Sequence, residues 1–453
     1  MLSLYYGIAN LMELSQQHYL GHLTEVSKNN KVILVDDVFN ERGMLVVKKG
    51  VEVDKIFAKK IAKHKLLKPL DHSISLTFTL NQRTSFEIFT QRLNDMQLSD
   101  IVRHNGMYQY AIDSFHLLTQ YPLVTQKLTV LAERMPDVFA RSLLTSVIAI
   151  SLCKELKLSK KTAENVFLAN IISDVGLLHI DPLIVNKEGQ YTQCEWKMMQ
   201  GHVVIAKHFA DMVPNLSRTV GLAILEHHER ADGFGYPFSK HAEQLGIEGQ
   251  ILAMVDKVSA IYRKLVKNGP HSWTSVIAVV QLPSTAHPKA VHKGIMRLLN
   301  GFSVEYIAAF SELEFKLLVV LCIEKRERLN LWFKEFARIY VDHKDLMKDS
   351  ENFKPLALLH QLEYTVIDSG VLSQAQHTWL SRLEIKLSEI DFVDIEEFAL
   401  LLDEVEYQSL FVMRKLVASK DELEKRFNGH ELPSLYYQGL MNILDPDDKQ
   451  NFS

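Results

Sequence analysis

The chain has 453 residues, a length that suggests about three domains, and a composition typical of a globular protein, with 47% apolar and 23% charged residues. A formal net charge of −4 argues against general affinity for nucleic acid. The three cysteines are scattered, which excludes a disulfide framework and a cysteine-based zinc site and fits a reducing cytoplasm. The N-terminus has no basic segment before an apolar run, and no stretch of about 18 uncharged apolar residues occurs, so we expect no signal peptide and no membrane insertion.

Residues 1–82 are predicted to form a small α+β module. A β-branched run at 31–38, a turn at 40–43 and a second run at 44–49 predict a hairpin. The spacing of apolar residues at 54–67 predicts an amphipathic helix. Eight lysines lie in and near this helix. They could attract a nucleotide or an acidic partner, but a solvated helix face is the commoner arrangement.

Residues 83–135 are predicted to be a helical connection, broken at Pro122, that leads into a central all-α domain at 136–302. Ser159 is a candidate N-cap within that domain. The helices predicted there span residues 136–156, 162–175, 195–212, 220–228 and 249–266. The fold class is therefore mainly α.

The C-terminal region, residues 303–453, is also predicted to be helical, and it contains no metal or phosphate motif. Residues 311–340 are predicted to form one or two long helices, and further helices are predicted at 356–363, 380–387 and 395–415.

The most distinctive stretch of the chain is EHHERADGFGYP at 226–237, in which two adjacent imidazoles lie among carboxylates at a predicted helix end. We expect Gly233 and Gly235 to take positive φ angles and Pro237 to stop the helix. A histidine pair at a helix end beside a rigid loop is well placed to hold a metal ion. A surface turn with two solvated histidines is the alternative, but it accounts poorly for the rest of the run.

Other ionisable residues on the central helices could join this histidine pair. Imidazole and carboxylate donors suit iron, manganese or zinc, and residues from separate helices can converge inside a bundle. Each candidate also has a plainer interpretation, as a polar helix end, a partly buried histidine or an exposed acid. The candidate metal ligands are Asp174, His202, His227, His228 and Asp256.

Residues 139–299 resemble an HD-GYP domain, the branch of the HD phosphohydrolase superfamily that cleaves cyclic di-GMP. HHERADGFGYP at 227–237 matches the pattern HHExxDGxGYP completely. Three other segments follow the order of the family, namely ANIISDVG at 169–176, EWKMMQGH at 195–202 and ILAMVDKVSA at 251–260. In addition, residues 37–50 are similar to the small domain that often precedes HD-GYP domains in bacterial proteins.

Several positions depart from the family pattern. The His-Asp pair that names the superfamily reads Ser173-Asp174, and Leu177 stands in place of the lysine that follows it. The upstream helix has no histidine near Leu143 or Leu144. The HD motif is therefore interpreted as degenerate.

These departures fall unevenly on the two metal positions that the resemblance implies. The first metal would take the upstream histidine, the histidine of the pair and Asp256, and two of these ligands are missing. The ligands of the second metal are all present, namely Asp174, His202, His227 and His228. We therefore expect one divalent metal ion (iron, manganese or zinc) in a three-histidine, one-carboxylate shell. The alternative is a metal-free core in which these histidines form hydrogen bonds. His179 is expected in a loop, not as a replacement ligand.

We predict a cytoplasmic bacterial signalling protein whose degenerate HD-GYP domain binds partner proteins, with cyclic di-GMP as a candidate ligand. One metal ion and no cation at position 177 would stabilise transition-state charge poorly, so efficient hydrolysis is not expected. The alternatives are an active metal-dependent cyclic di-GMP phosphodiesterase and a structural adaptor without metal or nucleotide. The predicted contact loop comprises Asp232, Gly233, Gly235, Tyr236 and Pro237.

Overall fold

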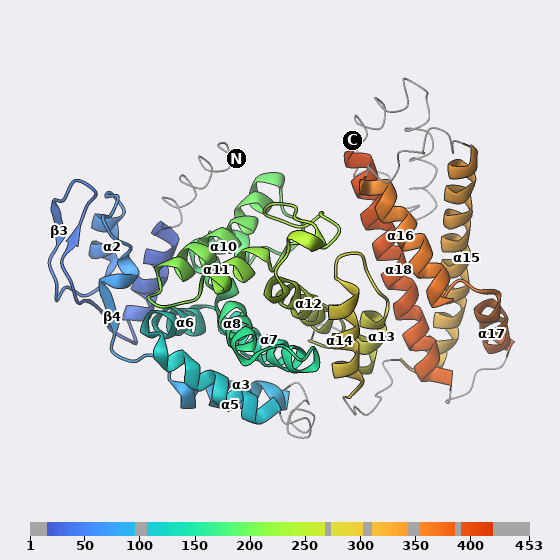
Figure 1. Ribbon diagram of the computed structural model, residues 1–453, viewed down its shortest axis with the longest axis horizontal. Coiled ribbons are helices and arrows are strands. Elements are labelled where there is room, and N and C mark those ends of the chain that lie inside the picture. Colours follow the sequence, from blue (N-terminus) through green and yellow to red (C-terminus); the bar gives the residue numbers. More distant parts are fainter. Residues whose placement is uncertain are drawn as a thin grey trace. The chain divides into compact units, whose positions relative to one another are not determined.

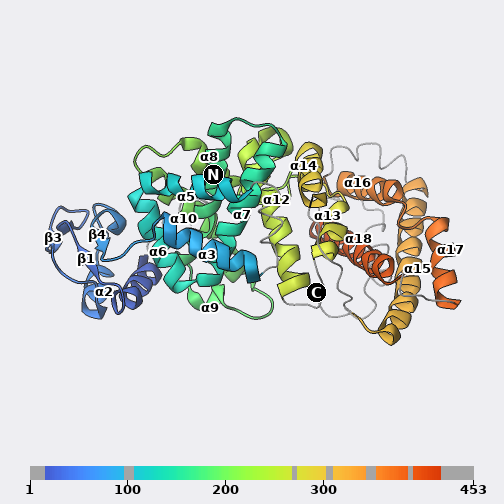
Figure 2. The ribbon, with the colours of Figure 1, turned by 90° about the horizontal axis from the view of Figure 1, so that it is seen from below.

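A computed structural model describes residues 16–95, 107–267, 273–301, 310–342, 354–385 and 391–419 (Figures 1 and 2). The described residues are mainly α-helical with a few short strands, which confirms the predicted fold class. The chain divides into two compact units. The first takes in residues up to 259 together with 293–301, and the second takes in 260–292 and the residues from 302 onwards. The expected lack of a signal peptide concerns residues that lie partly outside the described ranges.

The N-terminal module is built from two antiparallel strand pairs and helix α2, Lys55–Ile61 (Figure 2). Strands β2 (Val38–Phe39) and β3 (Leu45–Val47) form the predicted hairpin, in a shorter form. Strand β1 (Val32–Leu34) pairs instead with β4 (Ile74–Leu76). The prediction of one strand over 31–38 was therefore wrong, and β4 was missed because three residues give too short a pattern.

A polar side chain explains where the predicted strand breaks. The Asp37 carboxylate accepts a hydrogen bond from the backbone N–H of Lys49 at 2.8 Å, between β1 and β2. The Asp54 side chain caps α2 by accepting from the N–H of Phe57 at 2.7 Å. Helix α2 is shorter than predicted and ends at Ile61.

Between this module and the central domain, the described residues form helices α3 (Gln82–Asp95), α5 (Met107–Leu117) and α6 (Pro122–Arg134). Pro122 opens α6 at its first turn, where a proline needs no hydrogen-bond partner for its nitrogen. Pro122 therefore marks the start of α6 as well as the break that was predicted in the helical connection.

The central helices are α7 (Pro136–Glu155), α8 (Lys160–Ile172), α9 (Pro182–Val185), α10 (Gln193–Met212), α11 (Arg218–Glu226), α12 (Ile247–Tyr262) and α14 (Lys289–Asn300). Helix α8 packs between α7 and α11, and α11 packs on α10 (Figure 1). Ser159 caps α8 as predicted, with its hydroxyl accepting from the N–H of Thr162. The helix predicted at 162–175 ends at Ile172, and the chain continues as a 3₁₀ segment, η3, over Ser173–His179.

Among the helices of the described residues, only α7 is both long enough and apolar enough to cross a membrane. The same test is passed by core helices of globular proteins. In α7, 78% of the apolar window is buried, and the helix packs against α6 and α8. Its apolar character is thus explained by its place in the core.

The second unit is helical throughout its described part. Helix α18 packs against α13, α15 and α16, and α15 also packs against α17. The region predicted at 311–340 is a single helix of 31 residues, α15. The end of the helix predicted at 380–387 lies outside the described residues. The bounds are α13 (Trp273–Gln281), α15 (Glu312–Asp342), α16 (Lys354–Ser369), α17 (Gln374–Ile385) and α18 (Phe392–Ala418).

Candidate metal centre

Three imidazoles meet between helices α10 and α11. His202 lies on α10, His227 caps the C-terminal end of α11, and His228 follows it. One ligand nitrogen from each ring lies within 4.8 Å of the other two. His202 and His227 are each only 4% exposed. Two helix segments therefore bring the three predicted histidine ligands into one buried cluster.

Backbone carbonyl groups orient two of these rings. The Nδ1 atom of His202 lies 2.5 Å from the carbonyl oxygen of Met199, and Nδ1 of His227 lies 2.6 Å from that of Ile224. If each Nδ1–H donates to its carbonyl, each Nε2 keeps its lone pair for the cluster, which is the usual arrangement of metal-binding histidines. The Nε2 atom of His202 is buried and has no hydrogen-bond partner within the described part of the chain. A cation is a suitable partner for it.

Two carboxylates flank the imidazoles. Asp174 comes from η3, and its Oδ1 lies 4.0 Å from Nε2 of His202. Asp256 comes from α12, and its Oδ2 lies 3.6 Å from Nδ1 of His228. The five residues predicted as ligands therefore lie together, and the donor set of three imidazoles and a carboxylate fits one divalent ion.

The protonation of these groups suits a cation. Burial alone would raise the pKa of Asp174, but Arg141, and then His202 and His227, outweigh burial and hold that pKa at about 2. Burial, followed by the neighbouring His227, lowers the pKa of His202 to about 4. Burial likewise lowers the pKa of His228 well below its usual value. At pH 7 these shifts leave Asp174 ionised and His202 and His228 neutral, which are the forms that bind metal.

Arg141 is a residue of this site that the sequence prediction missed. It lies on α7, and its Nη2 donates to Oδ2 of Asp174 at 2.6 Å. The sequence did carry a signal, because Arg141 is the only charged residue between Asp137 and Lys154 of an otherwise apolar helix. A lone cation in such a position needs an anionic partner when the helix is buried.

Ser173 and Leu177, the positions interpreted as degenerate in the sequence, contribute no donor to the cluster. The Ser173 hydroxyl donates to the carbonyl oxygen of Asn170 at 2.9 Å, within the end of α8. Leu177 is 6% exposed and belongs to the apolar core. His179 lies at the end of η3, where its Nε2 is 3.0 Å from the Nζ of buried Lys127.

The two glutamates that flank the histidine pair fix the loop that follows. Glu229 is 2% exposed, and its carboxylate accepts from the N–H groups of Phe238 at 2.6 Å and Lys240 at 3.0 Å. Glu226 accepts from Nζ of Lys240 at 2.6 Å and from the N–H of Gly246 at 2.9 Å. The loop is thus tied back onto the segment that carries the imidazoles.

The two loop glycines are required for different reasons. Gly233 has a φ of +77°, and a Cβ there would lie 2.5 Å from Cε1 of His241. Gly235 does not take a positive φ, so that prediction was wrong. Its restriction is steric, because a Cβ would lie 2.3 Å from the backbone nitrogen of Arg230.

Aromatic rings extend from the cluster towards solvent. Tyr236 stacks on His228 with ring centroids 4.9 Å apart, and Trp196 meets Tyr236 edge-on at 5.7 Å. Trp196 is 43% exposed and Phe238 is 50% exposed. Asp232 has an inward role, since its carboxylate pairs with Arg230 at 2.6 Å. This surface therefore includes two exposed aromatic side chains, Trp196 and Phe238.

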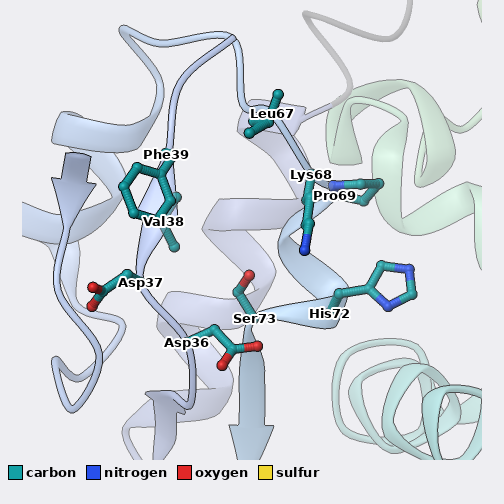
Figure 3. A pocket seen from close by; sticks show the side chains of 9 residues that line it. All are labelled: Asp36, Asp37, Val38, Phe39, Leu67, Lys68, Pro69, His72 and Ser73. Atoms are coloured by element: carbon teal, nitrogen blue, oxygen red, sulfur yellow. The ribbon is translucent and has the colours of Figure 1, made fainter. Parts of the chain in front are cut away.

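A separate pocket of about 710 Å³ lies in the N-terminal module (Figure 3). Its lining includes Asp36, Phe39, Lys68 and His72, and none of the five predicted metal ligands. Of the eight lysines noted in the sequence, Lys68 alone lines it.

Comparison with known proteins bears on residues 124–284, which match the family model of the HD domain. The cyclic di-GMP phosphodiesterase PdeB of Borreliella burgdorferi is 28% identical over 170 residues, 37% of this chain and 44% of that protein. The 3'3'-cGAMP-specific phosphodiesterase 1 of Vibrio cholerae is 28% identical over 130 residues, 29% of this chain and 30% of that protein. A cyclic di-GMP phosphodiesterase of Thermotoga maritima is 26% identical over 181 residues, 39% of this chain and 44% of that protein. Each match spans less than half of the relative's length.

Proposed function

We propose that this chain, whose residues 124–284 match the HD domain, is an HD-GYP domain protein and a bacterial signalling protein that holds one divalent metal ion and binds a cyclic dinucleotide with little turnover. The proposal is carried by the cluster of His202, His227 and His228, in which the buried Nε2 of His202 has no hydrogen-bond partner among the described residues. Asp174 would complete the shell. An ion of iron, manganese or zinc there supplies a Lewis acid for a phosphate oxygen.

The ligand class follows from the relatives and from the surface beside the cluster. The relatives are named for cyclic di-GMP or for 3'3'-cGAMP, which are both cyclic dinucleotides. Exposed aromatic rings can stack on nucleobases, and Trp196 and Phe238 are exposed close to Tyr236. The same surface is suited to contact a partner signalling protein. We place both interactions in the cytoplasm.

Weak turnover follows from the residues at the degenerate positions. A two-metal site holds both the attacking and the leaving oxygen of a phosphodiester. Ser173 and Leu177 offer neither a metal ligand nor a cation. The loss of one electrostatic element typically slows a reaction by about a hundredfold or more. Losses at two positions therefore argue against efficient hydrolysis.

Metal analysis, calorimetry and a hydrolysis assay on one preparation test this proposal. We expect about one metal ion per chain and measurable binding of cyclic di-GMP or 3'3'-cGAMP. We also expect the rate of hydrolysis to be far below the rate of nucleotide binding. His202→Ala should lose the metal ion. His208→Ala, on the same helix but outside the cluster, is the matched control and should keep it. A preparation without metal, or without detectable nucleotide binding, would contradict the proposal.

An active phosphodiesterase is the second candidate, because the relatives described above carry that name. Steady hydrolysis with manganese or iron that Asp174→Ala abolishes would establish that function and refute weak turnover. A chain that binds neither metal nor nucleotide would instead be a structural adaptor.

A further inference from the structure

The two oxygens of the Asp174 carboxylate face different cationic partners. Oδ2 accepts from Nη2 of Arg141 at 2.6 Å. Oδ1 is directed towards the histidine cluster, 4.0 Å from Nε2 of His202. In a two-metal site, a bridging carboxylate gives one oxygen to each ion, and the ions lie about 3.5–4 Å apart. Here one of the two oxygens is engaged by a guanidinium.

The Arg141 guanidinium also lies within electrostatic reach of the other residues of the site. The Asp174 carboxylate raises the pKa of Arg141, and Asp256 adds to that increase. Arg141 in turn contributes to the lowered pKa values of His202 and His228, after burial and the neighbouring histidines. A single positive charge thus pairs with Asp174 and lies within electrostatic range of Asp256.

We propose that the Arg141 guanidinium takes the place of a second metal ion and so limits this site to one. The inference rests on the proposed function, since it requires that the histidine cluster binds metal. A guanidinium is always protonated and donates in a fixed planar fork, so it can hold a carboxylate permanently where a metal ion would have to be captured from solution.

The position of Arg141 makes it hard to displace. The side chains of Arg141 and Asp174 are only 18% and 15% exposed. The guanidinium is carried by α7, whose neighbouring residues Leu143 and Val147 are buried in the core. A metal ion that competes for Oδ2 of Asp174 would have to leave the Arg141 charge without its partner, and an unpaired buried charge is costly.

Manganese titration of the full chain tests the inference without any measurement of activity. Free Mn²⁺ is followed by electron paramagnetic resonance, and bound metal is counted after desalting. Arg141→Lys keeps a cation and is the matched control for Arg141→Gln, which removes it. We expect one Mn²⁺ per chain in the wild type and in Arg141→Lys, and a second, weaker equivalent in Arg141→Gln.

A second set of variants restores a ligand type at the degenerate pair. Ser173→His alone leaves the guanidinium in place and should stay at one Mn²⁺ per chain. Ser173→His combined with Arg141→Gln should reach two. Circular dichroism melting identifies any variant that does not fold, and the wild-type count needs no variant at all.

The outcomes separate this inference from the proposed function. Two Mn²⁺ in the wild type or in Ser173→His would overturn the role of Arg141 and leave the metal site standing. One Mn²⁺ in folded Arg141→Gln would do the same. No metal in the wild type would overturn both.

Discussion

Gly176 and His202 touch through their backbones. A Cβ at position 176 would lie 2.1 Å from the carbonyl oxygen of His202, closer than any side-chain atom can approach a backbone oxygen. Segment η3, which carries Asp174, therefore packs directly on the turn of α10 that carries a predicted metal ligand. The glycine thus allows the backbones that carry the carboxylate and the imidazole to approach each other closely.

Gly176→Ala should push η3 away from α10. We expect a loss of about 1–3 kcal/mol in the free energy of unfolding, as for other overpacked sites, and a weaker affinity for metal. Urea unfolding and metal titration measure both. Gly21→Ala is the control, because Gly21 lies in the helix at 16–27 with nothing within 4 Å of the added Cβ, and it should be neutral or slightly stabilising. Equal effects of the two substitutions would contradict the packing argument.

The brace formed by Glu229 can be tested by hydrogen exchange. Glu229→Ala removes the acceptor for the N–H groups of Phe238 and Lys240. Because hydrogen bonds to charged groups contribute about 1.5–3 kcal/mol, we expect these amides to exchange at least about tenfold faster. Glu243→Gln, at an exposed position of the same loop region, should leave their exchange unchanged. Unaltered protection in Glu229→Ala would show that the loop is held by other contacts.

The buried pair of Lys127 and Asp71 should dominate the electrostatic contribution to stability. Nζ of Lys127 lies 3.0 Å from Oδ1 of Asp71, and the two side chains are 1% and 8% exposed. Lys127→Met leaves a buried carboxylate without its cation and should cost about 3–5 kcal/mol in urea unfolding. Lys207→Met breaks a solvent-exposed pair with Asp211 and should cost less than about 1 kcal/mol. The double variant Lys127→Met/Asp71→Asn should recover part of the lost free energy of unfolding. If it does not, the loss in Lys127→Met is not caused by the unpaired Asp71 carboxylate.

His22 should make the protein sensitive to acid. Burial, followed by Arg134, lowers the pKa of His22 to about 4, whereas the unfolded chain takes up this proton near pH 6.5. Between these two values the unfolded state binds more protons, so the free energy of unfolding falls as pH drops from about 6.5 to about 4. His22→Gln keeps an acceptor for Arg134 and should lose less stability between pH 7 and pH 5. The dependence is reduced, not abolished, because His202 also has a lowered pKa. Identical pH profiles of the variant and the wild type would refute this assignment.

The local sequence pattern was sufficient to predict much of the helical fold. Apolar periodicity and caps such as Ser159 gave the central helices close to their observed positions, because these helices are long and their signals lie within the sequence window. Strand β4 has three residues, and their partners in β1 lie 40 to 44 positions earlier in the chain, so no local pattern could indicate it. The end of α8 at Ile172 depends on the packing of η3 against α10, which is also non-local.

In the candidate site, too, the local sequence indicated some features, while others depend on residues that are distant in the chain. The histidine motif and its spacing indicated which residues would meet, and the structure brings these residues together, while metal binding itself stays a prediction. Arg141 was missed because its importance depends on a partner in another segment, Asp174. Gly235 was assigned the wrong constraint, since its close neighbour Arg230 becomes visible only when the loop folds back.

The cluster around Lys127 has a practical consequence for dissecting the protein. Tyr19 donates to Asp71 at 2.8 Å, stacks on His179 with centroids 4.6 Å apart, and lies under the Lys127 ammonium at 3.3 Å. A fragment that begins after the predicted module boundary at residue 82 would lose both the phenol and the carboxylate that surround this ammonium. In such a fragment the Lys127 ammonium beside η3 would lack its anionic partner, and we expect the fragment to express poorly or to aggregate. A recombinant fragment that contains the central domain should therefore retain the N-terminal module.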